Sequence, residues 1–191
     1  MSDPIVRLVR WREEAREAGT KLPEAMALAT ASPDGVPSVR LVLWRGEDAR
    51  SLWFFTNYQS RKGAELAKNP RASVCFHFPE QERQVRVDGE VELLPEADSD
   101  AYFATRPRGS QLGAWASPQS RPIASLDEVH AVVDSMAQRF EGKDVPRPPF
   151  WGGYRLVARA IEFWQGRGSR LHERELWEQG ADGWRMTRLA P

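Results

Sequence analysis

The sequence predicts one α+β domain, predominantly β, built on an antiparallel barrel. From residue 25 onward the chain consists of short extended runs separated by turn residues, which is typical of all-β barrels and sandwiches. Strand-like runs stand at both ends of this region with helix-like segments between them. The length of 191 residues suits a single core. We expect residues 1–20 to be an N-terminal helical or mobile segment and residues 21–191 to be the domain.

The first half of the domain is expected to alternate strands with one helix. Residues 26–30 and 38–44 predict a hairpin around a Ser-Pro-Asp-Gly turn at 32–35, and residues 52–56 predict a third strand. Ser60 can cap a helix that runs to Asn69, where Pro70 stops it. Residues 72–78 return to strand.

The clearest alternation in the chain follows at residues 84–93. Four apolar side chains are predicted to share the buried face, and the polar residues between them the other face. The four are Val85, Val87, Val91 and Leu93.

The second half of the domain is expected to hold two helices and three strands. Residues 98–105 predict a helix, followed by a short loop at 106–110. Ser125 opens a capping box with Glu128 and starts an amphipathic helix that ends at Gly142. Strands are predicted at residues 154–164, 170–178 and 184–189, the last two joined by a turn at 180–183.

Composition excludes several classes of protein. The 27 basic and 27 acidic residues cancel, so neither a general nucleic-acid binder nor a membrane-surface protein is expected. One cysteine and three scattered histidines argue against a disulfide and against a protein-bound metal. No apolar run of transmembrane length and no signal-peptide pattern occur, which makes the cytoplasm the expected compartment. Dinucleotide, P-loop and hydrolase motifs are also missing.

Three arginine-centred patterns suggest anion binding. Arg61 and Lys62 stand in the first turn of a predicted helix, where cations oppose the helix dipole unless an anion binds there. The alternative is a solvated pair of surface charges. Only four of the 27 basic residues are lysines, and arginine suits bidentate phosphate recognition.

The other two patterns lie further along the chain. Arg170, His172 and Arg174 would share one face of a predicted strand as a cationic row, unless the arginines simply pair with neighbouring glutamates. Arg106 and Ser110 in one short loop are able to wrap a phosphate, or else serve only as turn residues. Together with many aromatic residues, these patterns suggest a protein that binds phosphorylated ring compounds.

Ordered stretches of the chain resemble the pyridoxine/pyridoxamine 5'-phosphate oxidase family, FMN enzymes that form pyridoxal 5'-phosphate. The stretches run in family order over residues 22–191. They are Arg40-Leu-Val-Leu, Phe55-Thr-Asn, Ser60-Arg-Lys, Glu82-Arg-Gln-Val, Tyr102-Phe, Arg106-Pro-Arg-Gly-Ser-Gln-Leu-Gly-Ala-Trp, Gln119-Ser, Pro149-Phe-Trp-Gly-Gly, Ile161-Glu-Phe-Trp-Gln, Arg170-Leu-His-Glu-Arg and Arg188-Leu-Ala-Pro.

The resemblance implies a Greek-key, FMN-binding split barrel that acts as a homodimer with FMN at the subunit interface. It assigns FMN contacts to Arg40, Leu41, Val42, Leu43, Arg45, Phe55, Thr56, Arg61, Lys62, Gln84, Gln119, Ser120, Trp164 and Arg174. It assigns substrate contacts to Arg45, Tyr102, Arg106, Ser110, Arg170 and His172, and of these Arg170 and His172 would act as the catalytic residues that cover the substrate ring. No metal is implied.

The resemblance also implies the reaction. Pyridoxamine or pyridoxine 5'-phosphate would be oxidised by dioxygen to pyridoxal 5'-phosphate, with release of hydrogen peroxide and, from the amine, ammonia. Arg45 stands where the family usually has a lysine, and Phe55 where a tyrosine is common. Two alternatives remain: a related FMN oxidase acting on another substrate, such as a phenazine precursor, and a non-catalytic protein that binds flavin or pyridoxal phosphate.

Overall fold

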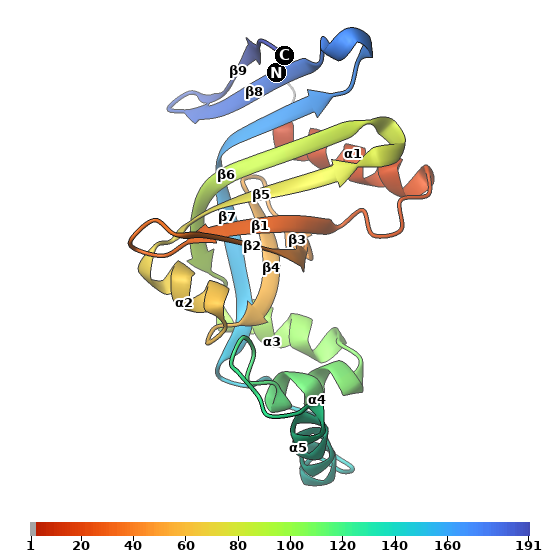
Figure 1. The fold of residues 1–191 in the computed structure, drawn as a ribbon, viewed down its shortest axis with the longest axis vertical. Helices are drawn as coiled ribbons and strands as arrows, with labels where there is room; N and C mark the ends of the chain where they lie inside the picture. Colours follow the sequence, from red (N-terminus) through yellow and green to blue (C-terminus); the bar gives the residue numbers. More distant parts are fainter. Residues whose placement is uncertain (1–2) are drawn as a thin grey trace.

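A computed structural model describes residues 3–191, and Met1 and Ser2, the start of the expected N-terminal segment, lie outside the described residues (Figure 1). Its strands are β1 (Ala25–Ala31), β2 (Pro37–Leu43), β3 (Gly46–Glu47), β4 (Ser51–Asn57), β5 (Arg71–Phe78), β6 (Arg83–Leu93), β7 (Trp151–Gln165), β8 (Glu173–Gly180) and β9 (Gly183–Leu189). Its α-helices are α1 (Pro4–Glu17), α2 (Arg61–Lys68), α3 (Glu96–Thr105), α4 (Arg108–Ala116) and α5 (Leu126–Arg139). Short 3₁₀ turns cover Pro79–Gln81 and Gly168–Arg170.

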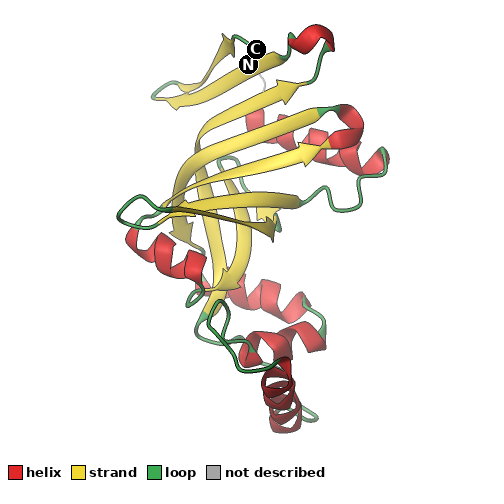
Figure 2. Ribbon diagram, in the orientation of Figure 1, coloured by secondary structure: helices red, strands yellow, loops and turns green. Residues whose placement is uncertain are grey.

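The strands form one curled antiparallel sheet with helices around it (Figure 2). Its main order is β2-β1-β5-β6-β7-β4-β3, and β8 and β9 extend it from β7. The 15-residue strand β7 pairs with β6 along one edge, while its other edge pairs first with β4 and then with β8. Because β4 and β8 share one edge of β7 at different heights, the sheet splits there, which confirms the predicted split-barrel class.

A glycine bulge bends the sheet beside this split. The register of β6 against β7 shifts between Asp88 and Gly89. A Cβ atom at Gly89 would lie only 2.1 Å from the carbonyl oxygen of Val157, so no other residue fits without backbone movement. The glycine therefore allows β6 and β7 to approach closely where the sheet curls.

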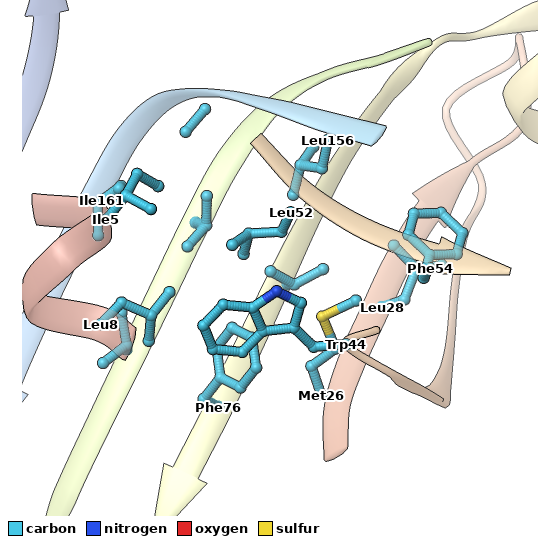
Figure 3. Packing of buried hydrophobic residues seen from close by; sticks show 14 of the residues in the cluster. Ile5, Leu8, Met26, Leu28, Trp44, Leu52, Phe54, Phe76, Leu156 and Ile161 are labelled. Carbon is cyan, nitrogen blue, oxygen red and sulfur yellow. The ribbon is translucent and has the colours of Figure 1, made fainter. Parts of the chain in front are cut away.

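Two apolar clusters hold the molecule together. The larger one fills the barrel with side chains from β1, β4, β5, β6 and β7, and Figure 3 shows Met26, Leu28, Trp44, Leu52 and Phe76 meeting there. The smaller cluster joins α3, α4 and the start of β7, and consists of Phe103, Leu112, Phe140, Val145 and Trp151. This second cluster fixes the helical end of the molecule against the sheet.

Helix α1 belongs to the larger cluster. Asp3 caps it by accepting a hydrogen bond from the Ile5 backbone N–H, and Pro4 stands in the first turn, where a proline costs no hydrogen bond. Leu8 is fully buried, and the ring of Trp11 packs edge-on against Phe163 with centroids 5.1 Å apart. The helix therefore closes one side of the barrel core. None of the helices in residues 3–191 combines the length and the apolar character needed to cross a membrane.

Three local expectations are wrong. Leu93 is 60% exposed because it ends β6, whereas Val85, Val87 and Val91 are buried as predicted. Of the loop expected at residues 106–110, only Arg106 and Pro107 connect two helices, since α4 already begins at Arg108. The strand expected at residues 170–178 begins only at Glu173, because Ser169 and Arg170 adopt positive φ angles of 58° and 61°.

Candidate functional site

A cavity of about 650 Å³ opens between the β2–β4 side of the sheet and helices α3 and α4. Its volume lies in the range of pockets that hold cofactors and small molecules. Many residues expected to bind FMN or substrate line it together: Arg40, Leu41, Val42, Leu43, Arg45, Phe55, Thr56, Lys62, Tyr102, Arg106, Ser110 and Gln119. Thr105, Pro107 and Trp151 complete the lining. These residues come from segments far apart in the sequence, so only the fold assembles them.

One end of the cavity holds a buried cation at the start of α2. Ser60 caps the helix by accepting from the Gly63 N–H, which places Lys62 in the first turn. Lys62 is only 8% exposed, and its ammonium donates to the side-chain oxygens of Thr56 (3.1 Å), Ser60 (3.3 Å) and Gln119 (3.2 Å).

No carboxylate of residues 3–191 forms an ion pair with Lys62. Burial lowers the pKa of its ammonium, and the nearby positive charge of Arg40 lowers it further. A buried cation without an anionic partner is costly in isolation and is stabilised when an anion binds beside it. This end of the cavity therefore has the charge of an anion site.

The other end of the cavity holds a second cation, Arg106. Its guanidinium stacks over the ring of Trp151 at 4.6 Å, and burial lowers its pKa. Its Nη1 atom is buried and has no hydrogen-bond partner within the described chain. Since buried guanidinium N–H groups are normally paired, this atom marks a place for an acceptor from a ligand. Tyr102 and Ser110 line the cavity nearby.

Aromatic and apolar side chains wall the space between these two cations. The rings of Phe55 and Tyr102 stack with centroids 3.9 Å apart, and the ring of Trp151 lies nearly parallel to both. Leu41 on β2 is 74% exposed beside them. Flat ring compounds with an anionic group beside each of the two cations match this arrangement.

Arg45 also lines the cavity but is tethered at its edge. Its guanidinium lies 3.7 Å from the carboxylate of Glu24, and its side chain is about one-third exposed. The guanidinium of Arg45 therefore faces the cavity while it also pairs with Glu24 outside the cavity.

A second group of predicted site residues lies away from the cavity, on β6, β7 and β8. Gln84 faces Trp164 across the β6–β7 pair, and Trp164 faces Arg174 across the β7–β8 pair. The rings of Trp164 and His172 lie 4.6 Å apart, and His172 Nδ1 accepts from the Arg167 N–H at 3.2 Å. Figure 1 places β8 at the opposite end of the molecule from α3 and α4.

The prediction that Arg170, His172 and Arg174 share one face of a strand is wrong. Only Arg174 lies on β8, while Arg170 and His172 stand in the bend before it because of the positive φ angles there. Arg170 is exposed, and Arg174 donates to the buried carboxylate of Glu162 at 2.8 Å. Neither Arg61 nor Ser120 lines the cavity, although both stand within two residues of residues that do.

Two buried carboxylates that form ion pairs with predicted site arginines, Glu162 and Glu65, were not identified from the sequence. Glu162 pairs with Arg86 and Arg174, and Glu65 pairs with Arg40 and Arg61. The four-residue spacing of Arg61 and Glu65 on one helix is a signal for the second pair, whereas the other contacts come from the fold. No group of three or more His, Cys, Asp or Glu side chains within residues 3–191 is arranged to hold a metal ion.

Comparison with known proteins gives two family matches that together cover most of the chain. Residues 12–140 match the model described as pyridoxamine 5'-phosphate oxidase. Residues 151–191 match the model described as the pyridoxine 5'-phosphate oxidase C-terminal dimerisation region. The second match includes β7, β8 and β9.

Similar full-length proteins include two pyridoxine/pyridoxamine 5'-phosphate oxidases. The one from Rubrobacter xylanophilus is 56% identical over 99% of this chain and 87% of its own length, and the one from Cupriavidus metallidurans is 53% identical over 99% and 89%. Among solved structures, PhzG from Burkholderia lata 383, in complex with tetrahydrophenazine-1-carboxylic acid, has a TM-score of 0.94 and 34% identity, covering 100% of this chain and 94% of its own. A pyridoxamine 5'-phosphate oxidase-related protein from Nostoc punctiforme shares the fold with a TM-score of 0.78 and 20% identity, covering 100% of both chains.

Proposed function

The chain belongs to the pyridoxamine 5'-phosphate oxidase family, and from this premise we propose that it oxidises pyridoxamine 5'-phosphate and pyridoxine 5'-phosphate to pyridoxal 5'-phosphate. Dioxygen is the final electron acceptor, and FMN is the cofactor. For the amine substrate the balanced reaction consumes dioxygen and water and releases ammonia and hydrogen peroxide.

The buried Lys62 supports FMN as the cofactor. Within residues 3–191 its hydrogen-bond partners are all neutral, so a phosphate beside it would supply a directly paired negative charge. The N-terminus of α2 adds backbone N–H groups and the positive end of a helix dipole to the same place. Arg40 lines the cavity with Lys62, and we assign Arg61, which precedes Lys62 on α2 and lies outside the lining of the cavity, as the third cation of this FMN phosphate site. Thr56 and Gln119 orient the ammonium.

The unpartnered Nη1 atom of Arg106 carries the proposal that the substrate has a phosphate. The guanidinium of Arg106 stacks on Trp151 and Arg106 lines the cavity, so an anionic group bound there would supply the acceptor that this atom lacks. Tyr102 and Ser110 supply hydroxyl donors for the same phosphate. A substrate without an anionic group in this position would leave the guanidinium unsatisfied.

We assign the completion of the site to a second copy of the chain. The match of residues 151–191 to a dimerisation region supports a homodimer. Trp164, Arg170, His172 and Arg174 belong to this region, and Gln84 on β6 pairs with Trp164. These five residues would reach FMN and substrate across the interface. The exposed Leu41 at the cavity mouth is the kind of apolar surface that a partner covers.

The chain's own residues mainly bind and orient. When bound, FMN supplies the two-electron chemistry that removes hydrogen from the substrate carbon and passes electrons to dioxygen. Arg106 and Lys62 would hold the anionic groups of substrate and cofactor and so orient both molecules in the cavity. Arg170 and His172 cover the outer face of the substrate ring and exclude water from it.

An anaerobic titration tests the proposal. Pyridoxamine 5'-phosphate added to the purified yellow protein without oxygen should bleach the flavin absorbance, and admitting air should restore it as pyridoxal 5'-phosphate appears. Bound flavin that stays yellow would refute the proposed substrate. The same failure with every donor tested would favour a binding protein without catalytic activity.

A second candidate function is oxidation of a carboxylated tricycle. The similarity to PhzG, whose structure contains tetrahydrophenazine-1-carboxylic acid, favours it. A substrate panel under the same anaerobic conditions separates the two. Faster bleaching by the tricyclic acid than by pyridoxamine 5'-phosphate would reverse the assignment.

A further inference from the structure

The carboxylate of Glu65 lies at the centre of a buried polar network on α2. Glu65 is only 7% exposed although it is acidic. Its Oε2 atom accepts hydrogen bonds from the hydroxyls of Thr30 (2.5 Å) and Ser38 (2.6 Å), which belong to β1 and β2. Burial alone would raise the pKa of Glu65, but these hydroxyls together with Arg61 and Arg40 lower it to about 2. The group is therefore a permanent negative charge at neutral pH.

The same carboxylate holds two arginines, one on each oxygen. Oε1 accepts from Arg61 Nε at 2.9 Å, and Oε2 accepts from Arg40 Nη2 at 3.4 Å. The Arg61 side chain is 59% exposed, and within residues 3–191 this is its only ion pair. Without Glu65 its guanidinium would be free to move in solvent.

Arg40 is held more tightly by the same network. Its Nη1 atom donates to the Leu28 carbonyl at 3.2 Å and to the Thr30 hydroxyl at 2.5 Å, and its Nη2 atom also donates to the Ser38 hydroxyl. These are the hydroxyls that donate to Glu65, so carboxylate, hydroxyls and guanidinium form one connected unit. Arg40 lines the cavity, and this unit therefore fixes a cavity wall.

We propose that Glu65 is a positioning residue of the FMN phosphate site, which orients Arg40 and Arg61 toward the phosphate and sets the charge of the site. Arg40, Arg61 and Lys62 carry three positive charges, and Glu65 leaves two, which matches a phosphate ester of nearly two negative charges at pH 7. Within residues 3–191 Lys62 forms neither a hydrogen bond nor an ion pair with Glu65, although the carboxylate is close enough to raise the pKa of its ammonium, so Lys62 remains available to the anion. This inference rests on the proposed binding of FMN at this cavity.

Comparing FMN with riboflavin, which lacks the phosphate, tests the role in the apoprotein by fluorescence titration. Glu65→Gln keeps the shape of the side chain and removes its charge. The dissociation constant for FMN should rise about tenfold or more, while that for riboflavin changes less than about twofold. Glu92→Gln is the matched control, because Glu92 pairs with Arg155 on the exposed sheet surface, and neither constant should change.

The possible outcomes separate the explanations. If Glu65→Gln weakens FMN and riboflavin binding equally, Glu65 only stabilises the fold. If the variant binds FMN more tightly, the charge of Glu65 merely repels the phosphate. Either result overturns the inference. In an Arg61→Ala background the effect of Glu65→Gln should shrink, since the part of it that acts through the Glu65–Arg61 contact is already lost. Wild-type protein that does not prefer FMN over riboflavin would instead refute the phosphate site itself.

A second variant covers the case in which Glu65→Gln does not fold. Glu65→Asp keeps the charge but shortens the side chain by one methylene, so it can no longer reach β1–β2 and Arg61 together. FMN binding should weaken severalfold with riboflavin binding unchanged. Unchanged preference for FMN in this folded variant would also overturn the inference.

Discussion

Replacing Arg106 with methionine should weaken substrate binding while leaving the free protein about as stable as before. The substrate loses a charge-assisted hydrogen bond to Nη1, which contributes roughly 1.5–3 kcal/mol, or about 10- to 150-fold in affinity. The fold loses stacking on Trp151, roughly 0.5–2 kcal/mol, but no longer buries an unpaired N–H, which costs roughly 1–3 kcal/mol. These opposing effects should leave the melting temperature within about 4 °C of wild type.

Two measurements check this reasoning about Arg106. The pyridoxamine 5'-phosphate concentration that half-saturates anaerobic bleaching reports substrate binding, and thermal unfolding of the apoprotein reports stability. Arg108→Met is the matched control, because Arg108 donates to the carbonyls of Phe140 and Lys143 and does not line the cavity. The control should lose about 1 kcal/mol of stability and keep substrate binding. A large loss of stability in Arg106→Met, or an unchanged half-saturating concentration, would refute the assignment.

Three other predictions concern pH, backbone and assembly. Because the folded pKa of Glu65 is about 2, below its ordinary 4.5, its ionisation stabilises the fold above pH 4.5 and this stability is lost as the pH falls toward 2. Urea unfolding at several pH values measures how far the free energy of unfolding falls on acidification. With solvent screening allowed for, this fall should be about 1 kcal/mol smaller in Glu65→Gln than in wild type. Equal falls in the two proteins would contradict the network. Gly89→Ala should destabilise the protein by at least about 2 kcal/mol in thermal unfolding, whereas Gly113→Ala, in an open position on α4, should be neutral or stabilising. Coexpressed Arg106→Met and Arg174→Met chains should recover about a quarter of wild-type activity, because half of the dimers then contain one intact shared site; no recovery would place both residues in the same subunit's site.

The sequence by itself determined the local elements. Ser60 and Ser125 cap helices because their hydroxyls accept N–H bonds two to three residues ahead, and this geometry depends only on neighbours in the chain. The alternation in β6 is equally local, since a strand exposes every second side chain to the core. The motif order was enough to indicate the family and most of the residues that line the cavity.

Tertiary structure alone decided which of these side chains meet. The long strand β7 pairs with β4 and β8 at different heights, and this split puts Lys62 and Arg106 around one cavity while Trp164 and Arg174 lie at the far end of the sheet. No local pattern contains that information, because the pairing of β4 with β7 joins residues about 100 positions apart, such as Phe54 and Tyr154. The contacts of Glu65 with β1 and β2 have the same origin: spacing along α2 predicts its pair with Arg61, but only sheet packing buries the carboxylate.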